Sequence, residues 1–482
     1  MLYRLSSHSF IREFGDFGYI LSNLTKHDRV YNYSGKYFLK TISRNPKDFN
    51  EGLNEISKIF YNTPVNILEK DYKDFLEDLA KDHYIVIGDT IDDLNKNEIH
   101  FTYSIDNPKT LARDFFDNDR SNNTKESQEA LGKYFRENPT IFHFQIEVTS
   151  RCNERCIHCY IPHENKIKDI NPDLYYKVID QINELGTMSL TISGGECFLH
   201  KEIDNFLKYA KSKDFNISIL TNATLLTDKQ IDLIKELEVS LVQVSVYSMN
   251  PEIHDFITKL PGSHKKTITN IEKMVKADIP VQISCPVMKI NMEGYKDVLQ
   301  WANGLKMKAY TDFIMMGKTD GTTDNLSQRI DLKETELLIK DIMDFDKDYI
   351  KMMEEIKPPT RDLEKYAEEP ICGVGRDTLC MIADGNLYPC AGWQGYLVGN
   401  AKEKSIAEIW KNSEKLNYLR NIKHKDFPRC LKCDAIDYCA MCLVRNFNEG
   451  GDMMKINENF CKSAKVNKMV VEEYIKKLKI KN

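Results

Sequence analysis

The sequence is organised around residues 147–160, which read EVTSRCNERCIHCY. Three of these residues, Cys152, Cys156 and Cys159, form a C-x3-C-x2-C pattern. A chain with 13 Cys in 482 residues contains that spacing by chance in about one case in a hundred. Structural zinc sites use two pairs of ligands, whereas three thiolates from one loop suit a 4Fe-4S cluster whose fourth iron stays open to an exogenous ligand. The three cysteines are therefore candidate ligands of such a cluster, and a zinc or purely structural site is the alternative.

The composition indicates a soluble globular protein of several domains. The length of 482 residues predicts about three domains, and 41% of the residues are hydrophobic and 29% charged. No apolar run approaches the length of a membrane helix, and the first residues, MLYRLSSHSFIREFGDF, lack the apolar core of a secretory signal. We therefore expect a cytoplasmic protein that does not bind membranes and whose reduced thiols serve as metal ligands rather than disulfides. The formal net charge of -6 gives no general attraction to nucleic acid.

Residues 1–95 predict a small α+β module. The patterns indicate strands over residues 17–21, 28–33, 33–39 and 84–87 and helices over residues 49–61 and 70–80. Together these elements predict a winged-helix-like module. Residues 96–140 are polar, and residues 118–129 are short of apolar side chains, so we expect a linker there.

Residues 141–320 alternate apolar strands with amphipathic helices, which is the pattern of parallel βα units. Six strands are predicted, over residues 142–148, 189–193, 217–221, 241–246, 281–287 and 309–314. Candidate ligand-binding residues follow the second, third and fourth strands: Gly194-Gly195-Glu196, Asn222 and Ser245. Chemistry in barrels of parallel strands sits at the carboxyl ends of the strands, where the cysteine loop also lies.

A second group of cysteines follows a bridging region over residues 321–369. Residues 370–465 contain Cys372, Cys380, Cys390, Cys430, Cys433, Cys439, Cys442 and Cys461, and residues 466–482 predict a C-terminal helix and tail. Eight thiols are enough for two sites of four thiolates each. Zinc knuckles are the alternative, because iron and zinc share thiolate ligands.

The cysteine loop and the strand-end motifs resemble the radical S-adenosylmethionine (SAM) superfamily. That resemblance implies a partial (β/α)6 barrel in which Cys152, Cys156 and Cys159 hold a 4Fe-4S cluster and SAM chelates the open iron. It also implies that Gly194, Gly195 and Glu196 hold the methionyl amine of SAM, that Asn222 and Ser245 contact SAM, and that cleavage of SAM releases a 5'-deoxyadenosyl radical. Lys259 stands where the superfamily usually has Arg.

The segment Gly385-Asn386-Leu387-Tyr388-Pro389-Cys390 resembles the G-x4-C element of the SPASM domain, an iron-sulfur extension of radical SAM enzymes that act on peptides and proteins. This resemblance implies two auxiliary 4Fe-4S clusters, held by Cys372, Cys380, Cys390 and Cys442 and by Cys430, Cys433, Cys439 and Cys461. Two residues rather than three precede the last Cys of the central group, so the assignment of Cys439 and Cys442 stays open.

Residues 1–95 resemble in pattern the recognition element of enzymes that mature ribosomally made peptides. That element adds an extended leader peptide to a sheet edge. A DNA-binding winged helix is the rival, but residues 71–81 are rich in Asp and Glu, so we expect no nucleic-acid partner.

Together these features predict a radical SAM enzyme that forms a thioether or carbon-carbon cross-link in a precursor peptide. A flavodoxin or ferredoxin would serve as its reductant. The alternatives are a peptide epimerase, a sulfatase-maturing type of enzyme and an iron-sulfur regulator. Ala391 stands where the sulfatase-maturing type has an Asp base. In an epimerase, Cys197 or Cys285 could return a hydrogen atom to the substrate, and Cys197 is the candidate catalytic residue because it follows Glu196.

Overall fold

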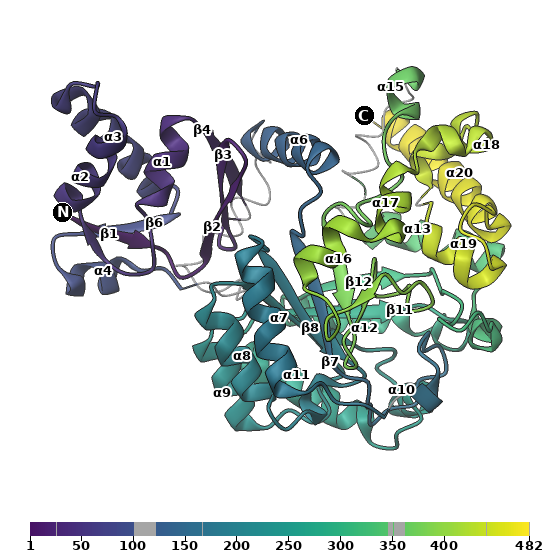
Figure 1. The fold of residues 1–482 in the computed structure, drawn as a ribbon. Helices are drawn as coiled ribbons and strands as arrows, with labels where there is room; N and C mark the ends of the chain where they lie inside the picture. Colours follow the sequence, from purple (N-terminus) through teal and green to yellow (C-terminus); the bar gives the residue numbers. More distant parts are fainter. Residues whose placement is uncertain are drawn as a thin grey trace.

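The computed structural model describes residues 1–25, 27–100, 122–165, 167–345, 350, 362–439 and 441–481. Figure 1 shows an N-terminal module on one side of a central sheet flanked by helices, with a helical C-terminal region on the other side. The fold is α/β, with a large mixed sheet whose barrel strands are parallel. None of the helices in the described ranges is both long and apolar enough to cross a membrane.

The N-terminal module contains two three-stranded sheets and four helices. One sheet has the order β5-β1-β6 and the other β2-β3-β4. The strands are β1 (Leu2–Leu5), β2 (Ser9–Phe14), β3 (Phe17–Ser22), β4 (Asp28–Asn32), β5 (Lys47–Asp48) and β6 (Ile85–Gly88). The helices are α1 (Ser34–Lys40), α2 (Phe49–Ile59), α3 (Val65–Lys81) and α4 (Ile91–Asn97).

The strand predicted over residues 33–39 is wrong, because this segment forms helix α1. Phe38 and Leu39 are adjacent in sequence, and both are buried in the module core. In a strand they would point to opposite faces, whereas a helix lets Phe38 pack against Tyr72 and Phe75 of α3. Tertiary packing thus overrides the alternating pattern.

The linker predicted over residues 96–140 needs correction in the part that the structure describes. Residues 96 and 97 complete α4, and α6 (Asn122–Glu137) is a helix that packs on the module. Its Leu131 and Phe135 join Phe10 and Phe14 of β2 and Phe142 in one hydrophobic cluster. The apolar side chains lie in the second half of the helix, beyond the polar stretch that suggested a linker. Residues 101–121 of the predicted linker lie outside the described residues.

The central sheet contains the six predicted barrel strands in sequence order, and each end lies within two residues of the prediction. They are β7 (His143–Thr149), β8 (Ser189–Gly194), β9 (Asn216–Thr221), β10 (Leu241–Ser245), β11 (Val281–Pro286) and β12 (Lys308–Asp312), and all are parallel. The intervening helices are α7 (Pro172–Glu184), α8 (Ile203–Ser212), α9 (Asp228–Glu236), α10 (Pro251–Thr258), α11 (Ser263–Lys276) and α12 (Tyr295–Gly304). Alternate strand residues are buried in the core, as expected when helices cover one face of a sheet.

The C-terminal region continues the barrel sheet instead of forming a separate one. Strand β13 (Thr378–Met381) pairs in parallel with β7, and β14 (Asn386–Tyr388) and β15 (Gly399–Asn400) extend the sheet further. The remaining helices are α13 (Leu332–Phe345), α15 (Leu363–Ala367), α16 (Ile406–Asn412), α17 (Glu414–Asn421), α18 (Pro428–Leu431), α19 (Leu443–Gly450) and α20 (Glu458–Lys481). Helix α20 runs unbroken across the boundary predicted between residues 465 and 466 and packs against α13.

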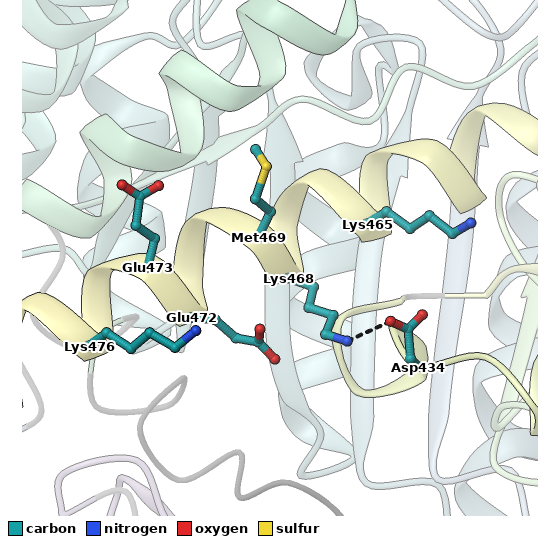
Figure 2. Close-up of a pocket in the computed structure, with 7 residues that line it drawn as sticks. All are labelled: Asp434, Lys465, Lys468, Met469, Glu472, Glu473 and Lys476. Carbon is teal, nitrogen blue, oxygen red and sulfur yellow. Dashed lines mark hydrogen bonds and ion pairs between the residues drawn. The ribbon is translucent and has the colours of Figure 1, made fainter.

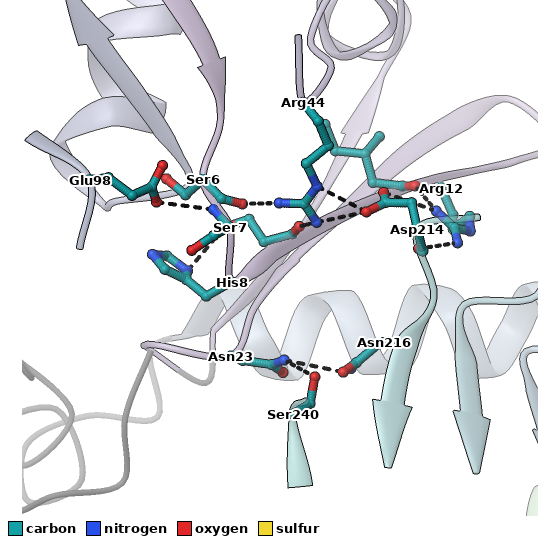
Figure 3. Close-up of polar contacts among 12 residues, drawn as sticks. Ser6, Ser7, His8, Arg12, Asn23, Arg44, Glu98, Asp214, Asn216 and Ser240 are labelled. Atoms are coloured by element: carbon teal, nitrogen blue, oxygen red, sulfur yellow. Dashed lines mark hydrogen bonds and ion pairs between the residues drawn. The ribbon is translucent and has the colours of Figure 1, made fainter. Parts of the chain in front are cut away.

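The N-terminal module docks at the amino ends of the barrel strands (Figure 3). Arg12 Nη2 donates to the carbonyl oxygen of Asp214 at 2.7 Å, and Arg44 Nε donates to Asp214 Oδ1 at 2.9 Å. Asn23 Nδ2 donates to Ser240 Oγ at 2.7 Å. Asp214 lies two residues before β9, and Ser240 immediately precedes β10. The module therefore lies at the opposite end of the barrel from the cysteine loop.

Candidate active site and cysteine groups

The cysteine loop leaves the carboxyl end of β7 and is tied to its neighbours by backbone hydrogen bonds. The N–H groups of Arg155 and Ile157 donate to the carbonyl oxygens of Thr258 and Ile257 at the end of α10, at 2.8 and 3.0 Å. Arg151 pairs with Asp169 at 2.7 Å. These contacts fix the loop on both sides of its first cysteine.

The three thiols of this loop lie close together and are partly exposed. Burial, followed by the charges of Glu154 and of the thiols Cys159 and Cys152, raises the pKa of Cys156 well above its ordinary value. The backbone N–H of Glu154 donates to the sulfur of Cys152 at 3.4 Å, and the hydroxyl of Tyr247 lies 4.0 Å from the sulfur of Cys156. Three neighbouring thiols, two of which receive hydrogen bonds, fit an iron-sulfur cluster, because cluster thiolates accept such bonds.

Gly194 and Gly195 allow the cysteine loop to approach the end of β8. A Cβ at Gly194 would overlap the carbonyl oxygen of Thr149, and a Cβ at Gly195 would overlap that of Arg151. The N–H groups of Gly195 and Glu196 instead donate to these same two oxygens, both at 2.8 Å. The two glycines therefore also allow close packing between the cysteine loop and the segment that follows β8, which the sequence alone did not reveal.

The carboxylate of Glu196 is fully buried and joins the ends of β8 and β9. It accepts from the backbone N–H of Asn222 and from the hydroxyl of Thr221, both at 2.7 Å, and from the N–H of Phe198 at 3.1 Å. Burial raises the pKa of Glu196, and these donors oppose the rise. An ammonium group of a ligand would add the positive charge that this set of neutral donors lacks.

Asn222 and Ser245 lie at the same end of the sheet. Asn222 Nδ2 donates to Asn153 Oδ1 of the cysteine loop at 2.9 Å, and Ser245 is the last residue of β10. The structure therefore brings the predicted SAM-binding residues and the cysteine loop together at the carboxyl ends of β7 to β10. Their contact with SAM stays a prediction.

Cys197 and Cys285 are both buried, with no exposed surface. The Cys197 thiol donates to the carbonyl oxygen of Leu220 at 3.6 Å, and both residues belong to the core beneath the barrel helices. Burial raises the pKa of Cys197 well above its ordinary value and that of Cys285 to about 12. Both thiols therefore resemble ordinary core cysteines.

The eight C-terminal cysteines separate into two groups in space. We call Cys372, Cys380, Cys390 and Cys442 the inner group and Cys430, Cys433, Cys439 and Cys461 the outer group. Burial and the charges of Cys442 and Cys390 raise the pKa of Cys372 to about 11. Burial, followed by the charges of Glu147 and Cys390, raises the pKa of Cys380 well above its ordinary value. Burial and the charges of Cys461, Cys430 and Cys433 raise the pKa of Cys439 to about 11.

This division places Cys442 with the inner group and Cys439 with the outer group, the assignment that spacing left open. Among the described residues, no three or more Cys, His, Asp or Glu side chains are arranged to hold a single metal ion. A cubane is held differently, since its thiolates bind separate irons. Ligation of iron by these eight cysteines stays a prediction.

Three further residues of the site were not identified from the sequence. Tyr160 is half-buried. Its desolvation, followed by the charges of Glu147, Cys159, Cys380 and Cys390, raises its pKa, so its hydroxyl lies near both the cysteine loop and the inner group. Gln394 Nε2 donates to Glu147 Oε1 at 2.8 Å. The one available signal was position: Tyr160 directly follows Cys159, and Glu147 stands two residues from the end of β7.

Comparison with known proteins agrees with this arrangement. Residues 146–302 match the Radical SAM superfamily, and residues 372–434 match the SPASM iron-sulfur cluster-binding domain. The chain contains a radical SAM domain and a SPASM domain. A radical SAM domain binds SAM and a 4Fe-4S cluster, and a SPASM domain binds auxiliary iron-sulfur clusters.

Two relatives are similar to this radical SAM and SPASM protein at 26% identity. The AdoMet-dependent heme synthase of Methanosarcina barkeri aligns over 65% of this chain and 94% of its own length. The antilisterial bacteriocin subtilosin biosynthesis protein AlbA of Bacillus subtilis aligns over 68% of this chain and 72% of its own length.

Solved structures share the fold. Streptococcus suis SuiB bound to the precursor peptide SuiA has a TM-score of 0.61 and 14% identity, and the match covers 95% of this chain and 99% of SuiB. The structure of anSMEcpe with bound AdoMet and a peptide has a TM-score of 0.53 at 17% identity and covers 70% of this chain and 98% of that protein.

Proposed function

We propose that this radical SAM enzyme modifies a ribosomally synthesised precursor peptide by forming a thioether or carbon-carbon cross-link. The observation that carries the proposal is the extent of the likeness to SuiB, which covers 95% of this chain and so takes in the N-terminal module. The heme synthase relative leaves about a third of this chain unmatched. A separate module is expected where a leader peptide must be held away from the chemistry.

Each part of the site has a proposed role. Cys152, Cys156 and Cys159 would hold the cluster, and the segment from Gly194 to Glu196, with Asn222 and Ser245, would hold SAM. When bound, these groups supply a 5'-deoxyadenosyl radical that abstracts a hydrogen atom. Eight further thiols, in the inner and outer groups, would hold the two auxiliary clusters.

We assign to Glu147 the role of accepting a proton from the substrate. Ile146 and Val148 are buried in the core beneath the helices, so Glu147 between them faces the inner side of the barrel. The Gln394 contact at 2.8 Å orients the carboxylate from the SPASM domain. Forming a thioether or carbon-carbon bond in place of two bonds to hydrogen releases a proton and one electron as well as the abstracted hydrogen atom. Glu147 would receive the proton, and an auxiliary cluster held by the inner group would receive the electron.

The burial of both spare cysteines favours cross-linking over epimerisation. An epimerase of this kind needs a thiol at the substrate that returns a hydrogen atom. Cys197 and Cys285 have no exposed surface and belong to the core beneath the barrel helices.

The decisive experiment is mass spectrometry of the product. Reconstituted enzyme is incubated anaerobically with SAM, a reductant and the short peptide from a neighbouring reading frame. Each cross-link should lower the peptide mass by about 2 Da, while an epimerase leaves the mass unchanged and introduces deuterium from heavy water. Deuterium uptake without the loss of about 2 Da would contradict the proposal. If that uptake then disappeared in Cys197→Ala, Cys197 would be the hydrogen-atom donor of an epimerase.

The matched control replaces Cys152, Cys156 and Cys159 with Ala. This variant should lose about four of about 12 irons and form no deoxyadenosine, with the auxiliary clusters retained. Glu147→Gln should still form deoxyadenosine but yield no cross-linked peptide. Heme formation without any peptide product would favour the activity named for the Methanosarcina relative instead.

A further inference from the structure

The outer cysteine group lies beside the protein surface, at the start of helix α20. Cys430 and Cys433 flank the end of α18, Cys439 follows a short 3-10 helix, and Cys461 lies in the first turn of α20. All four are partly exposed. A redox group so close to solvent can exchange electrons with a second protein, because electron transfer requires close approach.

Exposed lysines lie close to this group, beside the acidic side chains of Asp434 and Glu458. Lys432 lies between Cys430 and Cys433, and Lys462 and Lys465 follow Cys461 on α20; all three are exposed. Among the described residues, none of these three lysines forms an ion pair. Burial raises the pKa of Cys461, and the charges of Arg429 and Lys465 oppose that rise, so these cations lie near the thiol.

The same surface is hollowed along α20. Figure 2 shows Lys465 and Lys468 projecting from the helix, with Asp434 opposite Lys468. Asp434 directly follows Cys433 and pairs with Lys468 at 2.7 Å, which ties the segment around Cys433 to helix α20. The hollow has a volume of about 570 Å³, and Met469 supplies an exposed apolar side chain at its rim.

We propose that this surface, defined by Lys432, Lys462, Lys465 and the hollow along α20, docks an acidic one-electron carrier protein. The charge of the surface is the main argument. The whole chain has a net charge of -6, yet on this surface five lysines (Lys432, Lys462, Lys465, Lys468 and Lys476) outnumber three acids (Asp434, Glu472 and Glu473). A mostly polar surface with one apolar contact suits the small, transient interfaces of redox partners, which opposite charges steer together.

This inference rests on the proposed auxiliary cluster at the outer group but not on the identity of the peptide. It is tested by binding alone, with a purified acidic flavodoxin as the probe. Calorimetry at about 50 mM and about 300 mM salt should show that higher salt weakens binding to the reconstituted enzyme, because salt screens exposed charges.

The test variant carries Lys432→Glu, Lys462→Glu and Lys465→Glu. It should bind flavodoxin at least about tenfold more weakly at low salt. The control carries Lys58→Glu, Lys70→Glu and Lys81→Glu, three exposed lysines of the N-terminal module, and should bind as the wild type does. Equal weakening in both variants, or none in the test variant, would overturn the proposal.

A second measurement uses only the wild-type protein, so it does not depend on whether the variants fold. Carbodiimide joins lysines to carboxylates in contact, so cross-linked peptides from the wild-type complex should contain Lys432, Lys462 or Lys465. Cross-links confined to other lysines would overturn the docking site. Iron content of each sample shows separately whether the outer cluster is present, so failure of docking is distinguished from absence of the cluster.

Discussion

Gly194 shows how a single missing side chain shapes the site. Its neighbour in space is the carbonyl oxygen of Thr149, at the start of the cysteine loop. We predict that Gly194→Ala pushes this loop away from β8, so that the SAM cluster assembles poorly and iron content falls by about four. Gly304→Ala is the control, because a Cβ there meets nothing within 4 Å. Iron analysis and SAM binding measure both variants, and full cluster loading of Gly194→Ala would contradict the packing argument.

His8 should make the N-terminal module sensitive to acid. Burial, followed by the charge of Arg44, lowers the pKa of His8 from 6.5 to about 3. Below pH 6.5 His8 takes up a proton in the unfolded chain but not in the folded chain, so the free energy of unfolding decreases as the pH is lowered. At pH 5.5 the loss is about 1.4 kcal/mol relative to neutral pH, a factor of about ten.

Hydrogen exchange of the β2 and β3 amides measures this effect at pH 7.5 and 5.5, after correction for intrinsic rates. In His8→Asn the additional loss of protection at pH 5.5 should largely disappear, because Asn does not titrate. An unchanged pH response in that variant would assign the effect to another group.

Among the elements, strand β4 offers the edge at which a leader peptide can add. β3 pairs with one side of β4. On the other side, the hydroxyl of Ser127 in α6 donates to the carbonyl oxygen of Asp28, the first residue of β4, at 3.2 Å. That carbonyl therefore faces the outer edge, and so does the backbone of Val30, two residues on. The edge beyond α6 is where we expect the leader to pair.

Val30→Pro should therefore weaken leader binding by at least about tenfold, because proline removes the outward N–H while an edge strand tolerates it. Val30→Ala keeps the N–H and should bind nearly as the wild type does. Fluorescence anisotropy of a labelled leader peptide compares the two, and deoxyadenosine formation without peptide should not change. Equal affinities would exclude β4 as the receptor strand.

In the whole molecule, a polar interface holds the module to the barrel. Arg12 and Arg44 both contact Asp214, which is partly exposed, so each ion pair contributes at most about 1 kcal/mol. Asp214→Ala should speed hydrogen exchange in β2 about threefold to tenfold and lower peptide modification while sparing SAM cleavage. Asp180→Ala removes a similar pair with Lys213, between helix α7 and the end of helix α8, and should leave β2 unchanged.

Deleting residues 1–95 is a poorer test than these substitutions. Phe10 and Phe14 pack against Phe135 of α6 and Phe142 beside the barrel, so deletion would expose a large apolar surface. An exposed patch of that kind favours aggregation, which would obscure any effect on recognition.

The sequence by itself determined the parts that depend on neighbouring residues. The spacing of Cys152, Cys156 and Cys159 and the alternation of strands with helices are local patterns, so the cluster loop and all six barrel strands could be predicted. Tertiary structure decided the rest. Only folding could sort Cys439 and Cys442 between two groups, pair β13 with β7, convert residues 34–40 into a helix and bury Cys197 in the core. Each of these outcomes depends on contacts between residues far apart in the chain, whose energies no local pattern records.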